Sequence, residues 1–425
     1  MKPSGIEWIG DIPDDWEVRK ITTLLDNIGS GTTPPNNTDF YENGIIPWLN
    51  TGDLTDNYVD LIENKITEYA LNQYSALKIF PKDSVVIAMY GATIGKLGIL
   101  RESASTNQAC CVMQCNDNLY FKFLFYSLYG YREYILTLSY GSGQPNISQK
   151  IIKDLRLPTP PLKTQQKIAD YLDEKCGEID ATIAKQKESI EKLKAYKQSL
   201  ISETVTKGLD KSAPLKPSGI DYLGDIPSHW EIKKLKFVAN FNQNTLPEDT
   251  DGQFEFKYID IGNVSSVDGI KEIQYFNFSN APSRARRIVK YGDIIVSTVR
   301  TYLRAITSIK EDYDNCICST GFAVITPKDN FQQDFVVYAI ENESFIAQII
   351  ANSQGISYPA INVSQLENLK LAFPSVKEQK EIVDFLKTKL LEIDLTINKK
   401  QNIIQKLDAY KKSLIFECVT GKHKI

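Results

Sequence analysis

Lys2-Pro3-Ser4-Gly5-Ile6 returns, letter for letter, as Lys216-Pro217-Ser218-Gly219-Ile220. From Lys2–Lys20 to Lys216–Lys234, 12 of 19 positions are identical at a constant offset of 214. The same offset gives 12 of 19 identities between Glu188–Thr206 and Asn402–Thr420. Chance gives about one match in such a segment, so the chain is a tandem duplication of a unit of roughly 210 residues.

Between these matching ends, each copy alternates short β-rich runs with turns rich in Gly, Pro and Asn. The predicted strands include Ser84–Met89, Ala109–Gln114, Asp293–Val299 and Phe322–Thr326. Each copy also contains one predicted helix, at Leu119–Leu138 and at Gln332–Ala351. This mixture favours two similar domains of mixed α+β class.

Each copy ends in a proline-free stretch, Thr164–Lys207 and Lys377–Thr420, whose apolar residues follow a heptad pattern. Five heptads with apolar a and d positions are typical of a coiled coil. The predicted seam consists of Leu172, Ile179, Ile183, Ile190, Leu193 and Leu200 in the first stretch, and Leu386, Ile393, Ile397, Ile404, Leu407 and Leu414 in the second. Gln186 and Lys400 stand at the same d position in the two copies, and such polar breaks commonly set register.

The predicted fold is therefore α+β: two similar domains separated by two long helices that form an antiparallel coiled coil with pseudo-two-fold symmetry. The expected boundaries are residues 1–161 for the first domain and 162–208 for its helix, then 209–375 and 376–421 for the second pair.

Composition excludes several classes of protein. The chain has 425 residues with 42% hydrophobic and 24% charged residues, typical of a globular protein. It has no apolar run near the ~20 residues of a bilayer span and no signal peptide, so we expect a cytoplasmic protein without a membrane partner. Only two histidines are present, and the seven cysteines form no Cys-x-x-Cys pair. We therefore expect no metal site and no disulfides, with the cysteines serving as small apolar residues.

The repeated order of domain and helix resembles the specificity subunit of Type I restriction–modification systems over nearly the whole chain. The resemblance rests on Asp11-Ile12-Pro13 with Trp16, on Pro160-Pro161 followed by Gln165-Gln166-Lys167-Ile168, and on the repetition at 214. It implies one target-recognition domain for each half of a split sequence in double-stranded DNA. It also implies two methyltransferase subunits docked on the helices, with restriction (translocase) subunits joining the complex. S-adenosylmethionine, ATP and Mg²⁺ would belong to those partners, with no cofactor bound by this chain. The paired helices would fix the spacing between the half-sites.

The clearest candidate for DNA contact is a run of basic residues in the second domain, where arginine suits phosphate oxygens and the guanine edge. The net charge of −4 does not exclude DNA binding, because local patches decide it. The predicted contacts there are Arg284, Arg286, Arg287, Arg300, Tyr302, Arg304 and Tyr358.

The corresponding loop in the first domain is Tyr90–Lys96, and two other turns, Gly29–Pro35 and Gly141–Ser148, contain further polar candidates. Amide side chains there can pair with adenine, and each hydroxyl or cation is a weaker candidate. The predicted contacts are Ser30, Thr32, Thr33, Tyr90, Thr93, Lys96, Gln144 and Asn146.

Patterns typical of enzymes fail on inspection, so we expect no catalytic residue. Gly91–Leu97 has three residues between its glycines where a phosphate-binding loop needs four. No Asn-Pro-Pro-aromatic tetrapeptide of the amino-methyltransferase kind is present. Two alternatives remain: a metal-dependent nuclease using Asp53, Glu63 and Lys65, and a coiled-coil scaffold without DNA contact.

Overall fold

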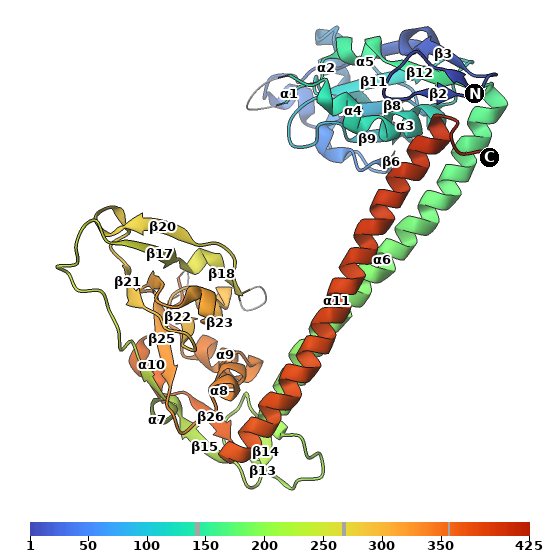
Figure 1. Ribbon diagram of the computed structural model, residues 1–425. Helices are drawn as coiled ribbons and strands as arrows, with labels where there is room; N and C mark the ends of the chain where they lie inside the picture. Colours follow the sequence, from blue (N-terminus) through green and yellow to red (C-terminus); the bar gives the residue numbers. More distant parts are fainter. Residues whose placement is uncertain (141–144, 266–268, 356–357) are drawn as a thin grey trace. The chain divides into compact units, whose positions relative to one another are not determined.

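The computed structural model describes residues 1–140, 145–265, 269–355 and 358–425 (Figure 1). The chain divides into two compact units. Unit 1 consists of Met1–Lys187 with Lys400–Ile425, and unit 2 of Glu188–Lys399. Each unit therefore combines one globular part with the start of one long helix and the end of the other.

Unit 1 is built on two mixed sheets, in which antiparallel pairs of strands predominate, with helices packed beside them. Its central sheet has the order β4-β11-β8-β9-β6, and a smaller sheet has the order β10-β5-β7. The strands are β1 Lys2–Pro3, β2 Asp11–Ile12, β3 Glu17–Lys20, β4 Leu25–Gly29, β5 Ile46–Leu49, β6 Asn57–Val59, β7 Lys65–Ile66, β8 Val85–Ala88, β9 Leu97–Leu100, β10 Ser105–Thr106, β11 Cys110–Cys115 and β12 Arg156–Thr159. The helices are α1 Thr38–Tyr41, α2 Glu68–Gln73, α3 Phe121–Gly130, α4 Arg132–Thr137, α5 Gln149–Asp154 and α6 Leu162–Lys207, the last of which continues into unit 2.

Unit 2 repeats this plan with two four-stranded sheets, β16-β25-β22-β23 and β20-β17-β24-β21. Its strands are β13 Leu215–Pro217, β14 Asp225–Pro227, β15 Glu231–Lys234, β16 Ala239–Phe241, β17 Glu255–Ile259, β18 Val264–Ser265, β19 Gly269–Ile270, β20 Gln274–Asn277, β21 Ala285–Ile288, β22 Ile294–Ser297, β23 Ile306–Ser308, β24 Ile317–Ser319, β25 Phe322–Pro327 and β26 Lys370–Phe373. Its helices are α7 Leu235–Val238, α8 Gln333–Ile340, α9 Glu343–Ala351, α10 Val363–Asn368 and α11 Val376–Val419.

The central strands are buried on both faces, which explains their continuous apolar sequence. Val85 and Ile87 of β8 face the cluster that contains α3, whereas Val86 and Ala88 face a second cluster with Leu49. In unit 2, Ile294 and Val296 face α8 while Ile295 faces the opposite cluster. The seven cysteines are all free and buried or half buried, as expected for small apolar residues.

The prediction of one continuous helix late in each globular part was wrong. The first is divided at Tyr131, whose ψ of 0° ends α3, and α4 begins directly afterwards. The second is divided at Glu341–Asn342, where the Asn342 side chain accepts a hydrogen bond from Ser344 N and caps α9. Asparagine favours helix N-caps because its side chain satisfies a free backbone N–H.

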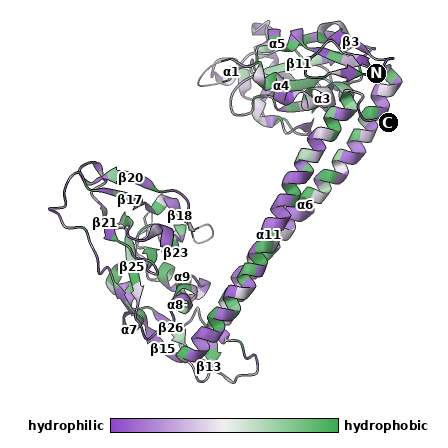
Figure 2. Cartoon of the chain, in the orientation of Figure 1, coloured by the Kyte–Doolittle hydropathy of each residue, from purple (hydrophilic) through white to green (hydrophobic). Residues whose placement is uncertain are grey.

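The long helices pair in an antiparallel manner within each unit. In unit 1, Lys411 Nζ contacts Asp180 at 2.7 Å while Lys400 contacts Gln186, so α11 runs backwards as α6 runs forwards. Unit 2 has the duplicated ion pair, Lys197 to Asp394 at 2.7 Å. Figure 2 shows hydrophobic and hydrophilic residues alternating along both helices.

The predicted seam lies between the paired helices. Leu172, Ile179, Ile183, Ile190, Leu386, Ile393, Ile397 and Leu414 are buried, and Leu193, Leu200, Ile404 and Leu407 are partly buried. Within the described ranges, no helix is both long and apolar enough to cross a membrane.

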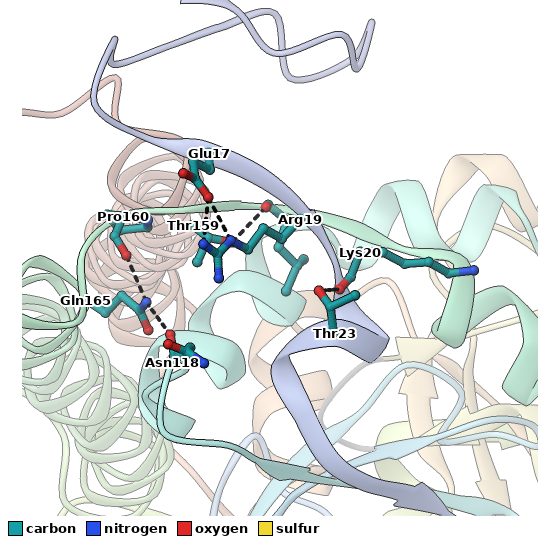
Figure 3. A network of polar contacts seen from close by, with 9 residues as sticks. Glu17, Arg19, Lys20, Thr23, Asn118, Thr159, Pro160 and Gln165 are labelled. Atoms are coloured by element: carbon teal, nitrogen blue, oxygen red, sulfur yellow. Dashed lines mark hydrogen bonds and ion pairs between the residues drawn. The ribbon is translucent and has the colours of Figure 1, made fainter.

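A buried glutamine attaches the start of each long helix to its globular part. Gln165 Nε2 donates to the carbonyls of Asn118 and Pro160 (Figure 3). The Oε1 atom of Gln165 accepts from Tyr120 N at 2.8 Å. Its duplicate Gln379 donates to Pro374 O and accepts from Gln332 N. Both side chains are almost fully buried, so these bonds fix where each helix leaves the domain.

Candidate nucleic-acid interface

The turn after β8 in unit 1 and the turn after β22 in unit 2 share an unusual backbone. Gly91 and Gly95 have φ of 84° and 76°, and Arg300 and Arg304, again four residues apart, both have φ of 51°. Positive φ suits glycine and costs roughly 1–2 kcal/mol in other residues. Unit 2 therefore holds arginine in two strained positions where unit 1 has glycine.

A second loop lies beside this turn in both units. Isolated β-bridges join Tyr90 to Asn146 in unit 1 and Val299 to Ala360 in unit 2. Segments far apart in the sequence thus meet in the same way in the two copies, next to the ends of the central strands.

In unit 1, polar side chains from four segments meet at this place. Gln149 Nε2 donates to Ser30 Oγ at 2.9 Å, and Thr33 Oγ1 donates to Gln108 Oε1 at 2.7 Å. Gln108 also hydrogen-bonds Tyr90, whose pKa is raised by burial despite that bond. The phenol therefore stays protonated and able to donate at neutral pH.

The remaining predicted residues of unit 1 are less closely connected. Thr32 takes part through its carbonyl, which accepts from Trp48 Nε1 at 3.1 Å. Lys96 is exposed and its N donates to the carbonyl of half-buried Thr93. Gln144 lies outside the described residues.

In unit 2, the predicted residues of the turn and of the neighbouring loop come together. The Arg300 guanidinium lies 5.2 Å from the ring centre of Tyr358, which is 67% exposed. Tyr302 is exposed between the two arginines. Arg304 pairs with Glu343 at 2.6 Å, so part of its charge is already neutralised.

Arg284 belongs to the same surface through its backbone. The Arg284 carbonyl accepts from Thr320 N. The residue after Thr320, Gly321, accepts through its carbonyl from Thr298 N, just before the turn that begins at Arg300. The Arg284 side chain is exposed, and that of Tyr258 lies near enough to feel its charge.

The two arginines of β21, Arg286 and Arg287, were also predicted to contact DNA, and both are half buried. Arg286 packs over the Phe278 ring at 4.5 Å and donates to Ala285 O. Arg287 is half buried, and its Nε has no hydrogen-bond partner among the described residues. Burial lowers the pKa of Arg287. Alternation along a strand turns neighbouring side chains to opposite faces, so a run of basic letters is not one surface.

Sequence reasoning missed four residues of these sites: Gln108, Gln149, Leu303 and Glu343. Gln149 follows the predicted Gly141–Ser148 turn directly, and an amide at that position was a usable signal. Gln108 and Glu343 depend on contacts between distant segments and had no local signal. Leu303 stands between Tyr302 and Arg304, both of which were predicted.

The structure gives no support to a nuclease site at Asp53, Glu63 and Lys65. Asp53 Oδ2 accepts from Asn50 N at 2.8 Å and caps the turn that follows β5. Glu63 and Lys65 are exposed, and Lys65 lies in β7. In the part of the chain that the structure describes, no group of three His, Cys, Asp or Glu side chains is placed to hold a metal ion.

Known proteins resemble this chain along nearly its full length. The MjaVIII Type I restriction enzyme specificity subunit of Methanocaldococcus jannaschii is 25% identical over 97% of this chain and 94% of its own. The EcoBI specificity subunit of Escherichia coli is 24% identical over 81% and 74%.

Two solved structures have the same fold. One, from a study of complex assembly and conformational transition of the Type I R-M system, has a TM-score of 0.70, covering 97% of this chain and 100% of its own at 14% identity. The HsdS subunit of Thermoanaerobacter tengcongensis has a TM-score of 0.54, covering 97% and 98% at 14% identity.

A family model described as the Type I restriction modification DNA specificity domain matches twice, at residues 13–194 and 227–406. The two matches fall on the two copies of the tandem repeat and together span most of the sequence. The chain therefore belongs to the Type I restriction modification DNA specificity domain family.

Proposed function

We propose that this chain is the DNA-recognition subunit of a Type I restriction–modification complex and reads a split target with one half-site per unit. The observation that carries the proposal is the shared turn with different side chains. The same backbone presents Thr93 and Lys96 in unit 1 but Arg300 and Tyr302 in unit 2. A conserved frame with exchanged polar groups supports the reading of two different sequences, because base edges are distinguished by donor and acceptor patterns.

Two methyltransferase subunits are the partners of the helices in this proposal. Tyr196 and its duplicate Tyr410 are both 55% exposed on α6 and α11. A repeated surface suits two copies of one partner. Restriction (translocase) subunits would join this assembly. S-adenosylmethionine, ATP and Mg²⁺ would be bound by those subunits.

The decisive experiment combines the full chain with its methyltransferase subunits and maps methylated adenines on random-sequence DNA. We expect one split sequence. If the Arg300 side chain reaches a base, Arg300→Ala should reduce the discrimination between bases in one half-site by about 1–3 kcal/mol. If the side chain reaches only phosphate, the variant should weaken binding to all sequences evenly. Thr93→Ala is the matched variant and should alter only the other half.

The alternative function, a metal-dependent nuclease, predicts that the isolated chain cleaves DNA. Our proposal predicts that the purified chain alone neither methylates nor cleaves DNA. Metal-dependent cleavage by the isolated chain, lost in Glu63→Gln and Lys65→Ala, would establish the nuclease instead. A complex that methylates without any shared sequence would also overturn the proposed recognition role.

Docking on the helices has its own test. Tyr196→Ala and Tyr410→Ala should each remove one methyltransferase copy, and the double variant should remove both. The mass of the intact complex measures how many copies remain. Two copies retained by the double variant would place the docking surface elsewhere.

A further inference from the structure

The turn between β22 and β23 carries its apolar side chains on the outside. Tyr302 is 54% exposed and Leu303 44% exposed, whereas Thr301 is only 4% exposed. The Thr301 hydroxyl points inward and lies 2.9 Å from Ser353 Oγ. The hydroxyl of Thr301 is therefore covered and paired, while two large apolar side chains next to it in the sequence are open to water.

The equivalent turn of unit 1 does not share this exposure. Thr93 and Ile94 occupy the matching positions and are both half buried, and Ile94 packs against the main core of unit 1. Leu303 is a member of no hydrophobic cluster among the described residues. The shared backbone therefore does not force the leucine outward, and its exposure is particular to unit 2.

The turn that carries Leu303 is held from both ends. Leu303 N donates to Arg300 O at 2.8 Å, and Arg304 N donates to Thr301 O at 3.2 Å. Thr301 is fixed to Ser353 and Arg304 to Glu343. A rigid tip loses little conformational freedom when it enters a binding partner, so its apolar surface contributes more fully to affinity.

Charge around the tip favours nucleic acid as its partner. Arg300 and Arg304 stand on either side of Tyr302 and Leu303, and Arg300 is exposed above the Tyr358 ring. Arginine recognises phosphate oxygens, and proteins that insert an apolar wedge between base pairs kink the duplex at that step. An uncharged protein surface would match the leucine but would leave the Arg300 guanidinium without a counter-charge.

We propose that Tyr302 and Leu303 enter one base step of duplex DNA in the half-site read by unit 2, unstacking it while Arg300 binds an adjacent phosphate. This inference rests on the proposed recognition function and adds the shape of the DNA to it. Pyrimidine–purine steps unstack most readily, so the half-site of unit 2 should contain a TA or CA/TG step. Unit 1, whose Ile94 is packed inward, should leave its half-site stacked.

The test uses the full chain in complex with its methyltransferase subunits and a duplex that contains the mapped target. End-to-end energy transfer reports bending, and permanganate reactivity of thymines reports unstacking. Leu303→Ala and the double variant with Tyr302→Ala should reduce both signals in the second half-site. They should weaken binding about tenfold or more with an unchanged salt slope, because no charge is removed. Leu215→Ala, a leucine of unit 2 with 50% exposure in β13, is the matched control and should change neither signal.

The outcomes distinguish the insertion of Tyr302 and Leu303 between base pairs, called the wedge below, from the recognition role. Unchanged bending and affinity in the double variant, with unchanged melting temperature, would overturn the wedge while one split sequence is still read. Loss of a methyltransferase subunit with DNA shape unaltered would assign Leu303 to a protein interface instead. A complex that reads no split sequence at all would remove the recognition role, and the wedge with it.

Discussion

Lys400 Nζ donates a hydrogen bond of 3.0 Å to Oε1 of Gln186, its own counterpart 214 residues earlier in the chain. Both side chains are half buried at d positions of the helix seam, where leucine or isoleucine stands in the neighbouring turns. A polar pair at this depth stabilises one register of the helices, because a shift by one heptad would separate the amide from the ammonium group.

Replacing both residues by leucine should therefore raise the free energy of unfolding by about 1–2 kcal/mol, since a well-packed apolar pair often exceeds a buried polar one. Gln186→Leu alone should lower it by about 1 kcal/mol, because Lys400 loses its acceptor in a partly dehydrated position. Urea unfolding of the wild type, the two single variants and the double variant gives the coupling energy. Strictly additive effects would show that the two side chains do not interact in solution.

Replacement of Gln165 should reduce stability more than replacement of Gln186. Its side chain is fully buried with three hydrogen bonds, so Gln165→Leu leaves Tyr120 N and two carbonyls without partners. We expect a loss of about 2–4 kcal/mol in the stability of unit 1. Gln379→Leu, which removes the duplicate contact, should destabilise unit 2 in the same way. Hydrogen exchange at α3 and α8 measures the two effects separately, and equal protection in variant and wild type would refute the role.

Arg300→Gly should leave the protein as stable as before or more stable, although it removes a large side chain. Glycine relieves the φ of 51°, and this gain offsets the extra entropy of glycine in the unfolded chain. The same variant should weaken DNA binding by the complex. Thermal unfolding and a binding isotherm on one preparation check both parts.

The reverse substitution in unit 1 supplies the control for strain. A Cβ at Gly91 would meet no atom within 4 Å, so Gly91→Ala measures the cost of positive φ alone. We expect a loss of about 1–2 kcal/mol. If Gly91→Ala is neutral while Arg300→Gly is destabilising, the strain assigned to this turn is wrong.

The stability of unit 2 should fall as pH rises through neutrality. Burial raises the pKa of Glu341 from its ordinary value of 4.5 to about 7, against the opposing charges of Lys197 and Lys310. The folded state binds this proton more tightly than the unfolded chain, so the contribution is fully present below pH 4.5 and is lost as pH rises through 7.

Glu341→Gln should flatten that dependence. The variant should exceed the wild type in stability at pH 8 by roughly 1–3 kcal/mol and lose the advantage near pH 5. Melting temperatures recorded from pH 5 to 8 test the point. Parallel curves for the two proteins would show that Glu341 titrates as an ordinary exposed carboxylate.

Sequence alone predicted the features that repeat with a fixed period. The offset of 214 identified the duplication, and the heptads predicted which residues form the seam. The order of domains and helices along the chain predicted the antiparallel pairing that Lys400 and Gln186 display. It also matched the Tyr90–Lys96 loop to the arginine turn of the second copy. These predictions succeeded because burial along a helix and identity between copies leave traces in neighbouring letters.

The sites themselves were only partly predictable. Whether Arg287 is exposed depends on which face of β21 its side chain occupies. The hydrogen bonds of Ser30 with Gln149 and of Thr33 with Gln108 join residues far apart in the sequence. Three-dimensional pairing, rather than local composition, determines these contacts. The break at Tyr131 is different, because it directly follows Gly130, a residue typical of helix ends that the prediction of one helix over Leu119–Leu138 passed over.

The last segment of unit 1, Lys400–Ile425, follows the whole of unit 2 in the sequence. Ile415, Cys418 and Val419 are fully buried in its core against residues of the first domain. During synthesis, the ribosome therefore releases every residue of unit 2 before unit 1 receives these side chains. Chain growth at roughly 5–20 residues per second makes that wait tens of seconds. The domain that emerges first is therefore completed last, and until then the apolar surface that Ile415, Cys418 and Val419 cover is exposed to water.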